Sequence, residues 1–142
     1  MDKYSVYMSV YCKENPQYFK QSVESMLSQT ISPDEIIIVC DGPLTVELDQ
    51  VIQELCKESP CIKIVRLPEN KGRSYAAQAG LDACSNEIVL RMDSDDISVP
   101  TRAEKSIEAL KDCDIVGGVI AEFSDDIMDV TGLRVLPLTH KE

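Results

Sequence analysis

Residues 35–40 read Glu-Ile-Ile-Ile-Val-Cys, and the chain leaves this run through Asp41-Gly42-Pro43. Such an unbroken run of β-branched residues indicates a strand that is buried on both faces. Strands of this kind occur in parallel sheets that helices cover on both sides, and the rest of the chain shows the matching alternation of strand and helix patterns. The other predicted strands lie at 5–11, 62–67, 87–92, 114–117 and 119–123.

Amphipathic helical patterns fill the gaps between the predicted strands. Asn15 supplies a capping side chain and Pro16 suits the first helical position, so the first helix is expected to begin here. The apolar stripes of the four predicted helices lie at 19–27, 48–55, 76–83 and 103–110. The third stripe consists of small residues, which allow a helix to approach a sheet closely. Residues 1–142 are therefore predicted to form an α/β fold with a Rossmann-like, mostly parallel sheet flanked by helices.

Composition narrows the class of protein. The chain has 142 residues, of which 44% are hydrophobic and 27% charged, as expected of a soluble globular domain. No segment reaches the ~20 apolar residues of a membrane span, and no secretory segment is evident, so a cytoplasmic location is expected. The net charge of −11 argues against nucleic-acid binding. Six cysteines without a C-x-x-C pair, and a single histidine, argue against structural zinc and favour reduced thiols.

Three carboxylates follow the predicted strand at 87–92, in the sequence Asp93-Ser94-Asp95-Asp96. Clustered carboxylates repel one another, and burial raises the cost of their charge. A hard divalent cation such as Mg²⁺ or Mn²⁺ removes that cost, because it prefers oxygen ligands. The alternative interpretation is a polar turn that caps the following helix.

Polar residues also follow the other strands. Asp41 ends the second strand; its carboxylate could accept a hydrogen bond from the N3–H of uracil, which cytosine lacks, or it could serve only the turn. Lys71 and Arg73 precede the third helix, where they could bind an anion or form a solvated surface pair. Because ligands bind at the carboxyl ends of parallel strands, four loops are expected to converge on one cleft.

With these residues placed, the chain resembles the N-terminal, nucleotide-sugar-binding half of a family 2 glycosyltransferase with the GT-A fold. The resemblance covers nearly the whole chain, and it depends on the order and spacing of the motifs more than on any one of them. The matching stretches are Ser9-Val10-Tyr11, Asn15-Pro16 through Leu27-Ser28-Gln29-Thr30, Pro33-Asp34-Glu35-Ile36, Asp41-Gly42-Pro43, Asn70-Lys71-Gly72, Arg91-Met92-Asp93-Ser94-Asp95-Asp96 and Pro100.

The resemblance implies a nucleotide-diphosphate sugar donor, most often UDP-linked, with Mn²⁺ or Mg²⁺ as cofactor. Asp41 corresponds to the aspartate that holds the base, and Asp93 and Asp95 to the metal-binding pair, while Asp96 assists or only caps the next helix. The residues expected at the nucleotide are Ser9, Tyr11, Glu14, Asp41, Lys71, Arg73 and Asp93.

The family's inverting transfer to a saccharide or lipid-linked acceptor needs a general base, which the resemblance places in a second half beyond this chain. The catalytic residue is therefore unassigned, since the contexts of Asp125, Asp126 and Asp129 do not match the family's base motif. Two hypotheses about the function remain open: the donor half of a glycosyltransferase, or a nucleotide-binding module without catalysis. A nucleotidyltransferase is disfavoured, because no glycine-rich loop follows the first strand.

Overall fold

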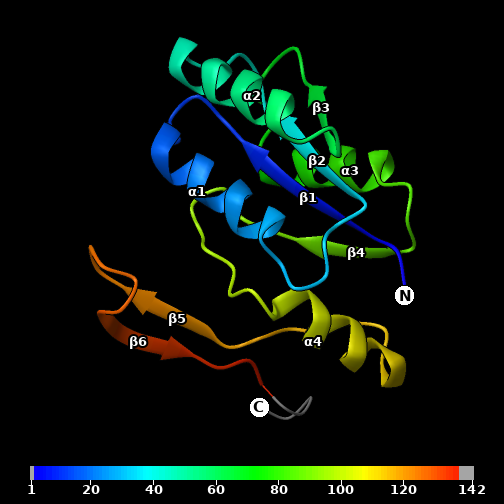
Figure 1. Cartoon of the computed structure of the whole chain (residues 1–142). Coiled ribbons are helices and arrows are strands. Elements are labelled where there is room, and N and C mark those ends of the chain that lie inside the picture. The colour runs from blue at the N-terminus through cyan, green and yellow to red at the C-terminus, as the bar shows by residue number, and fades with distance from the viewer. Residues whose placement is uncertain (1, 138–142) are drawn as a thin grey trace. The chain divides into compact units, whose positions relative to one another are not determined.

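The computed structural model describes residues 2–137. These residues form two compact units, with the boundary between Glu104 and Lys105. The first unit holds the parallel sheet and three complete helices, and a fourth helix begins at its end (Figure 1). Each unit is described by itself.

Four parallel strands form the sheet of the first unit, in the order β3-β2-β1-β4. The strands are β1 (Tyr4–Val10), β2 (Glu35–Cys40), β3 (Ile62–Arg66) and β4 (Ile88–Arg91). The helices are α1 (Pro16–Leu27), α2 (Val46–Glu58), α3 (Arg73–Ala83) and α4 (Arg102–Ala109), which a 3₁₀ turn at Leu110–Asp112 follows. The predicted parallel sheet flanked by helices is thus confirmed.

Helices cover both faces of this sheet, so its central strands are buried. Every residue of β2 is buried, as its β-branched run predicted. Tyr7, Ile37 and Val39 point to the face that α3 covers, where they pack with Ala76. Their neighbours along the strands point to the opposite face, on which α1 and α2 lie (Figure 1).

Local signals set the ends of the helices. Asn15 Oδ1 accepts hydrogen bonds from the backbone N–H groups of Gln17 at 2.9 Å and Tyr18 at 3.2 Å, so Asn15 caps α1 as predicted. Thr45 caps α2 in the same way, through its hydroxyl and the N–H of Leu48 at 3.3 Å.

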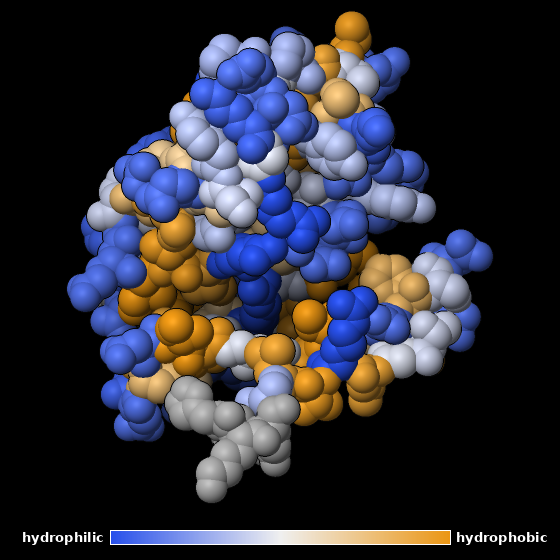
Figure 2. All heavy atoms as spheres, turned by 180° about the vertical axis from the view of Figure 1, so that it is seen from behind, coloured by the Kyte–Doolittle hydropathy of each residue, from blue (hydrophilic) through white to orange (hydrophobic). Residues whose placement is uncertain are grey.

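The second unit corrects one prediction. Residues 114–117 do not form a strand, because only Ile115 and Val116 are apolar and the pair Gly117-Gly118 follows them at once. The predicted strand at 119–123 is present as β5 (Ile120–Phe123), but it pairs antiparallel with β6 (Val130–Arg134), which the sequence did not suggest. Orange areas in Figure 2 show hydrophobic residues at the surface, and in this hairpin Leu133 is 67% exposed.

Two further expectations concern the whole described chain. None of its helices is long and apolar enough to cross a membrane. All six cysteines are free thiols, and Cys40 is buried within β2. Burial raises the pKa of the Cys40 thiol to about 11, so this cysteine behaves as a small hydrophobic residue at neutral pH.

Candidate functional site

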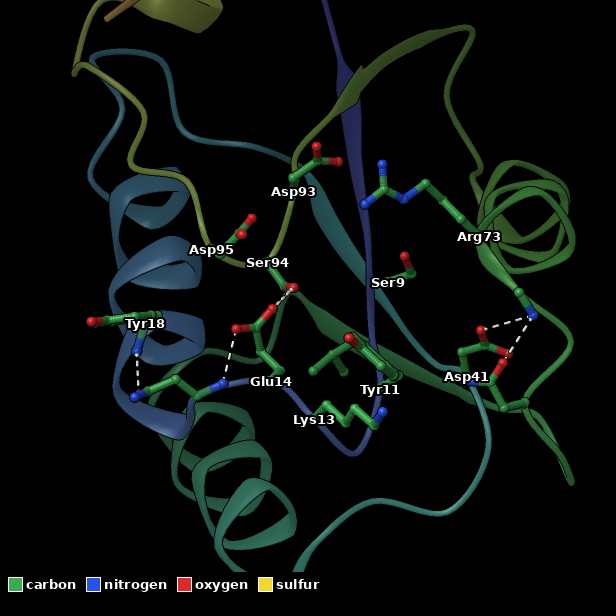
Figure 3. A pocket seen from close by; sticks show the side chains of 14 residues that line it. Ser9, Tyr11, Lys13, Glu14, Tyr18, Asp41, Arg73, Asp93, Ser94 and Asp95 are labelled. Atoms are coloured by element: carbon green, nitrogen blue, oxygen red, sulfur yellow. Dashed lines mark hydrogen bonds between the residues drawn. The ribbon is translucent and has the colours of Figure 1, made fainter. Parts of the chain in front are cut away.

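A cavity of about 610 Å³ opens at the carboxyl ends of the parallel strands, a size typical of small-molecule sites. The segments that follow all four strands contribute to its wall (Figure 3). The residues that line it are Ser9, Val10, Tyr11, Lys13, Glu14, Asn15, Tyr18, Asp41, Asn70, Gly72, Arg73, Asp93, Ser94 and Asp95. The structure therefore brings the four predicted loops together at one edge of the sheet.

The loop after β1 is tied to the acidic segment after β4. Glu14 Oε1 accepts a hydrogen bond from the Asn15 backbone N–H at 2.9 Å, and Glu14 Oε2 accepts one from the Ser94 hydroxyl. Tyr11 and Tyr18 stand along this wall with 43% and 55% of their surfaces exposed. Their rings are thus available to a planar ligand group, while Glu14 fixes the distance between two walls of the cavity.

Asp41 directly follows β2 and is only 6% exposed. Its Oδ1 accepts a hydrogen bond from the Lys71 backbone N–H at 2.9 Å, and its Oδ2 accepts one from the Gly72 N–H at 3.1 Å. A carboxylate offers about four lone-pair sites, so both oxygens can still accept a bond from a ligand. Asp41 therefore organises the loop before α3 and also presents a carboxylate to the cavity.

Two glycines let that loop lie close to the end of β2. Gly42 has a φ of 86°, and a Cβ at this position would lie 2.7 Å from the backbone nitrogen of Asn70. Gly72 has a φ of 90° and immediately precedes α3. L-residues with a side chain rarely adopt such angles, so both positions require glycine for this loop to form.

The two cations of this loop take different places. Arg73 begins α3, and its side chain reaches into the cavity on the side of Asp93 (Figure 3). Within residues 2–137 its guanidinium makes no hydrogen bond or ion pair. The side chain of Lys71 does not line the cavity; its ammonium lies 3.5 Å from Glu69 and 4.7 Å from the ring centre of Tyr75. Lys71 acts at the site through its backbone N–H, which donates to Asp41 Oδ1.

Asp93 and Asp95 stand on the opposite side of the cavity from Asp41 (Figure 3). Asp93 Oδ1 accepts hydrogen bonds from Nε and Nη2 of Arg91 at 3.2 and 3.0 Å. A smaller adjoining cavity of about 140 Å³ is lined by Arg73 and Arg91 as well as Asp93. Two guanidinium groups therefore offset the acidic end of the site in a chain of net charge −11.

A third arginine, Arg102, contacts the two residues that precede Asp93. Arg102 Nη2 donates to the Arg91 carbonyl oxygen at 2.7 Å, and its Nη1 lies 3.1 Å from the sulfur of Met92. Burial lowers the pKa of the Arg102 guanidinium, while the carboxylates of Asp96 and Asp93 act in the opposite direction. Asp96 itself is absent from the cavity wall, and its backbone N–H closes a turn onto the Asp93 carbonyl at 3.3 Å.

The donor set fits one mode of metal binding. Among the residues that the structure describes, no group of three or more His, Cys, Asp or Glu side chains is arranged around a common point. A cage built entirely from protein ligands is thus not formed. Asp93 and Asp95 nevertheless share the cavity wall, and Mg²⁺ is commonly held by one or two carboxylates together with substrate phosphates. The residues therefore fit a divalent ion that a diphosphate completes.

Sequence reasoning found most of this wall but not all of it. Of the predicted residues, Ser9, Tyr11, Glu14, Asp41, Arg73, Asp93 and Asp95 line the cavity, and the Lys71 side chain does not. Tyr18 was missed, although its place three residues after the cap Asn15 puts both on one side of the first helical turn. Ser94 was read only as part of the acidic motif.

With this geometry established, comparison with known proteins identifies the family. The sequence profile of Glycosyl transferase family 2 matches residues 5–135. The chain belongs to this family. An uncharacterized glycosyltransferase of Haemophilus influenzae is 43% identical over 99% of the chain and 53% of its own length. The UDP-Gal:alpha-D-GlcNAc-diphosphoundecaprenol beta-1,3-galactosyltransferase of Escherichia coli is 35% identical over 95% of the chain and 50% of its own length.

The fold of this family 2 chain also matches solved structures. The mannosyltransferase PcManGT of Pyrobaculum calidifontis, in complex with GDP-Man and Mn²⁺, aligns with a TM-score of 0.68 at 18% identity, over 84% of the chain and 34% of its own. S. aureus TarS 1-349 in complex with UDP aligns with a TM-score of 0.64 at 23% identity, over 77% of the chain and 32% of its own. These likenesses confirm the expected GT-A fold. The chain spans about half the length of the curated relatives it matches.

Proposed function

We propose that this chain binds a nucleotide-diphosphate sugar, with UDP as the nucleotide, and that the protein containing it transfers the sugar to a saccharide or lipid-linked acceptor in polysaccharide or glycoconjugate biosynthesis. One observation carries the proposal: Asp41 and the pair Asp93 and Asp95 face the same cavity from opposite sides. The family supports a nucleotide-sugar donor, and the E. coli relative, whose name gives a UDP-Gal donor, supports the choice of UDP.

Each side of the cavity suits one part of such a donor. The Asp41 carboxylate is held by two backbone N–H groups and can accept a hydrogen bond from the N3–H of uracil. Tyr11 offers a ring beside the nucleoside, and Arg73 a cation beside the phosphates. Asp93 and Asp95 would hold Mn²⁺ or Mg²⁺ against the diphosphate, and the ion when bound supplies positive charge that stabilises the departing UDP.

Transfer with inversion needs a further carboxylate as general base, and we assign none in this chain. Asp126 Oδ1 accepts the Met128 N–H at 2.9 Å, and Asp129 Oδ2 accepts the Ser124 hydroxyl at 2.6 Å. Both acids thus serve the turn between β5 and β6. Neither bond supports Asp126 or Asp129 as the base, so a nucleotide-binding module without catalysis remains the second candidate function.

The metal dependence of UDP binding tests the proposal. We expect calorimetric titration to give strong UDP binding with Mn²⁺ and weak binding with EDTA, because a chain of net charge −11 repels a diphosphate. Asp95→Ala should remove most of the metal effect. Equal UDP affinity with Mn²⁺ and with EDTA would refute the proposed role of the acidic pair.

Glu58→Ala is the matched control for this experiment. Glu58 lies exposed at the end of α2, outside the cavity, and its replacement removes the same single charge. Its metal-dependent UDP binding should equal that of the unmodified protein. If Glu58→Ala and Asp95→Ala weaken binding equally, the effect is one of net charge and not of coordination.

A further inference from the structure

Polar side chains of α1 and of the residues just after it contact both ends of the segment that runs from Asp93 to Ala103. Ser22 and Ser25 lie in α1, and Gln29 lies two residues beyond its end. Their spacings of three and four residues place the three side chains on one side of the helix axis. Ser22 is fully buried and Gln29 is 6% exposed. Polar side chains buried in this way are retained only when they are hydrogen-bonded, so their partners indicate what they do.

Those partners lie in residues 93–103, the segment that carries the acidic pair. The Ser22 hydroxyl donates to the Asp93 carbonyl oxygen at 2.8 Å. Ser25 Oγ accepts the Ser98 backbone N–H at 3.0 Å. Gln29 Nε2 donates to the Val99 carbonyl at 2.9 Å, and its Oε1 accepts the Ala103 N–H at 2.9 Å.

The three side chains also support one another. The Ser25 hydroxyl donates to the Ser22 carbonyl at 2.7 Å, and Gln29 Nε2 donates to the Ser25 carbonyl at 3.0 Å. Just beyond α1, the Thr30 N–H donates to the Pro100 carbonyl at 2.8 Å. The segment between β4 and α4 has no regular secondary structure. It is thus attached to α1 and the residues just after α1 at Asp93 and again at residues 98–103.

We propose that Ser22 and Gln29 are positioning residues, which hold the backbone of residues 93–103 in the conformation that a divalent ion requires. This inference rests on the proposed function of the cavity. Fixing one residue of a flexible backbone costs roughly 1–2 kcal/mol. A segment that α1 already holds does not lose that freedom when the ion binds, so affinity for the ion is higher.

Ser22 acts closest to the metal pair, because its partner is the carbonyl of Asp93 itself. Without the hydroxyl, this carbonyl loses its bond to α1 and Asp93 can turn away from Asp95. Gln29 acts at the far end, where it connects Val99 and the start of α4. Neither side chain lines the cavity, so neither touches the nucleotide.

Two measurements on Ser22→Ala and Gln29→Ala test the inference. The first is amide hydrogen exchange in metal-free protein. In Gln29→Ala the Ala103 N–H should exchange faster, because it loses its acceptor. In Ser22→Ala the Asp96 N–H should exchange faster, because it bonds to the Asp93 carbonyl that Ser22 holds. The second is calorimetry, in which each variant should weaken Mn²⁺-dependent UDP binding by roughly 5- to 30-fold and leave UDP binding in EDTA unchanged. Ser22→Thr, which keeps the hydroxyl, should restore part of the loss.

Ser28→Ala is the matched control, because Ser28 lies exposed next to α1 and its side chain makes no hydrogen bond in the described chain. It should leave both measurements unchanged. The inference is overturned if Ala103 in Gln29→Ala and Asp96 in Ser22→Ala exchange at unmodified rates, or if UDP binding falls equally with Mn²⁺ and with EDTA. If the unmodified protein shows no metal effect but the exchange rates rise, the proposed function fails while the contacts of α1 are upheld.

Discussion

At the scale of single residues, Asp41 combines two roles that the sequence presented as alternatives. Its carboxylate closes the turn before α3 through the N–H groups of Lys71 and Gly72, and it also lines the cavity. A short polar residue at a strand end is ordinary turn chemistry. Only its burial at 6% exposure and its place in the wall distinguish this aspartate from a surface turn residue.

Asp41→Ala should weaken UDP binding by roughly 1–3 kcal/mol, the usual cost of losing a hydrogen bond to a charged group. Part of that loss comes from the loosened loop and should affect UDP and CDP alike. The difference between the two nucleotides isolates base recognition, because only uracil carries the N3–H donor. Calorimetric titration of both nucleotides, in both proteins, gives this difference.

Asp95→Ala controls for effects at the other side of the cavity, and it should lower UDP and CDP affinities by the same factor. If the unmodified protein binds UDP and CDP equally well, Asp41 has no role in choosing the base and serves the turn alone.

At the scale of elements, α3 approaches β1 more closely than an ordinary helix could. A Cβ added to Gly80 would lie 2.9 Å from Cδ2 and 3.2 Å from Cβ of Tyr7, which is buried in the sheet. The small-residue stripe at 76–83 predicted such an approach, and Ala76 and Gly80 are indeed the buried residues of α3. The sequence could not indicate which strand would be approached, because the partner lies some seventy residues away.

Gly80→Ala should destabilise the first unit by about 1–3 kcal/mol through overpacking. The replacement also gains up to ~1 kcal/mol of helix propensity, but the contact with the Tyr7 ring and Cβ outweighs it, since the Cβ of a strand residue cannot move alone. Denaturant unfolding measures the net change. Gly118→Ala, where an added Cβ meets no atom within 4 Å, should change stability little, and an equally stable Gly80→Ala protein would contradict the account.

At the scale of the whole parallel sheet, Glu35 connects β1, β2 and β3 with the segment that leads into β4. It begins β2 and is 3% exposed. Its Oε1 accepts a hydrogen bond from Ser5 of β1 at 2.6 Å, and its Oε2 pairs with Lys63 of β3 at 2.6 Å. Ser85, just before β4, donates to it through both its backbone N–H and its hydroxyl. One buried carboxylate thus fixes the register at the amino ends of the strands.

This carboxylate should make unfolding depend on pH. Burial raises the pKa of Glu35, but the bonds from Lys63, Ser5 and Ser85 outweigh it and lower the pKa to about 2, from an ordinary 4.5. A lowered pKa means that the stabilisation is complete above pH 4.5 and is lost as the pH falls toward 2.

Glu35→Gln should therefore cost roughly 1–3 kcal/mol of unfolding free energy at pH 7. The difference in stability between the two proteins should shrink as the pH falls from 4.5 toward 2. Urea unfolding at pH 7, 4 and 3 gives the comparison. Glu58→Gln, at an exposed site, should show no such trend, and a difference for Glu35→Gln that is constant over this range would contradict the lowered pKa.

The sequence by itself determined what depends on residues close together in the chain: the four parallel strands, the helices between them, the cap at Asn15, and the polar residues that end each strand. Its failures have the same origin. Residues 114–117 resembled a strand, yet Gly117-Gly118 and the lack of a pairing partner among the described residues prevent one.

Only the tertiary structure decided the strand order β3-β2-β1-β4, the place of the Lys71 side chain outside the cavity, and the attachment of residues 93–103 to α1. Those contacts join residues 70 to 74 positions apart, and no local periodicity encodes which distant backbone group a buried serine or glutamine will find.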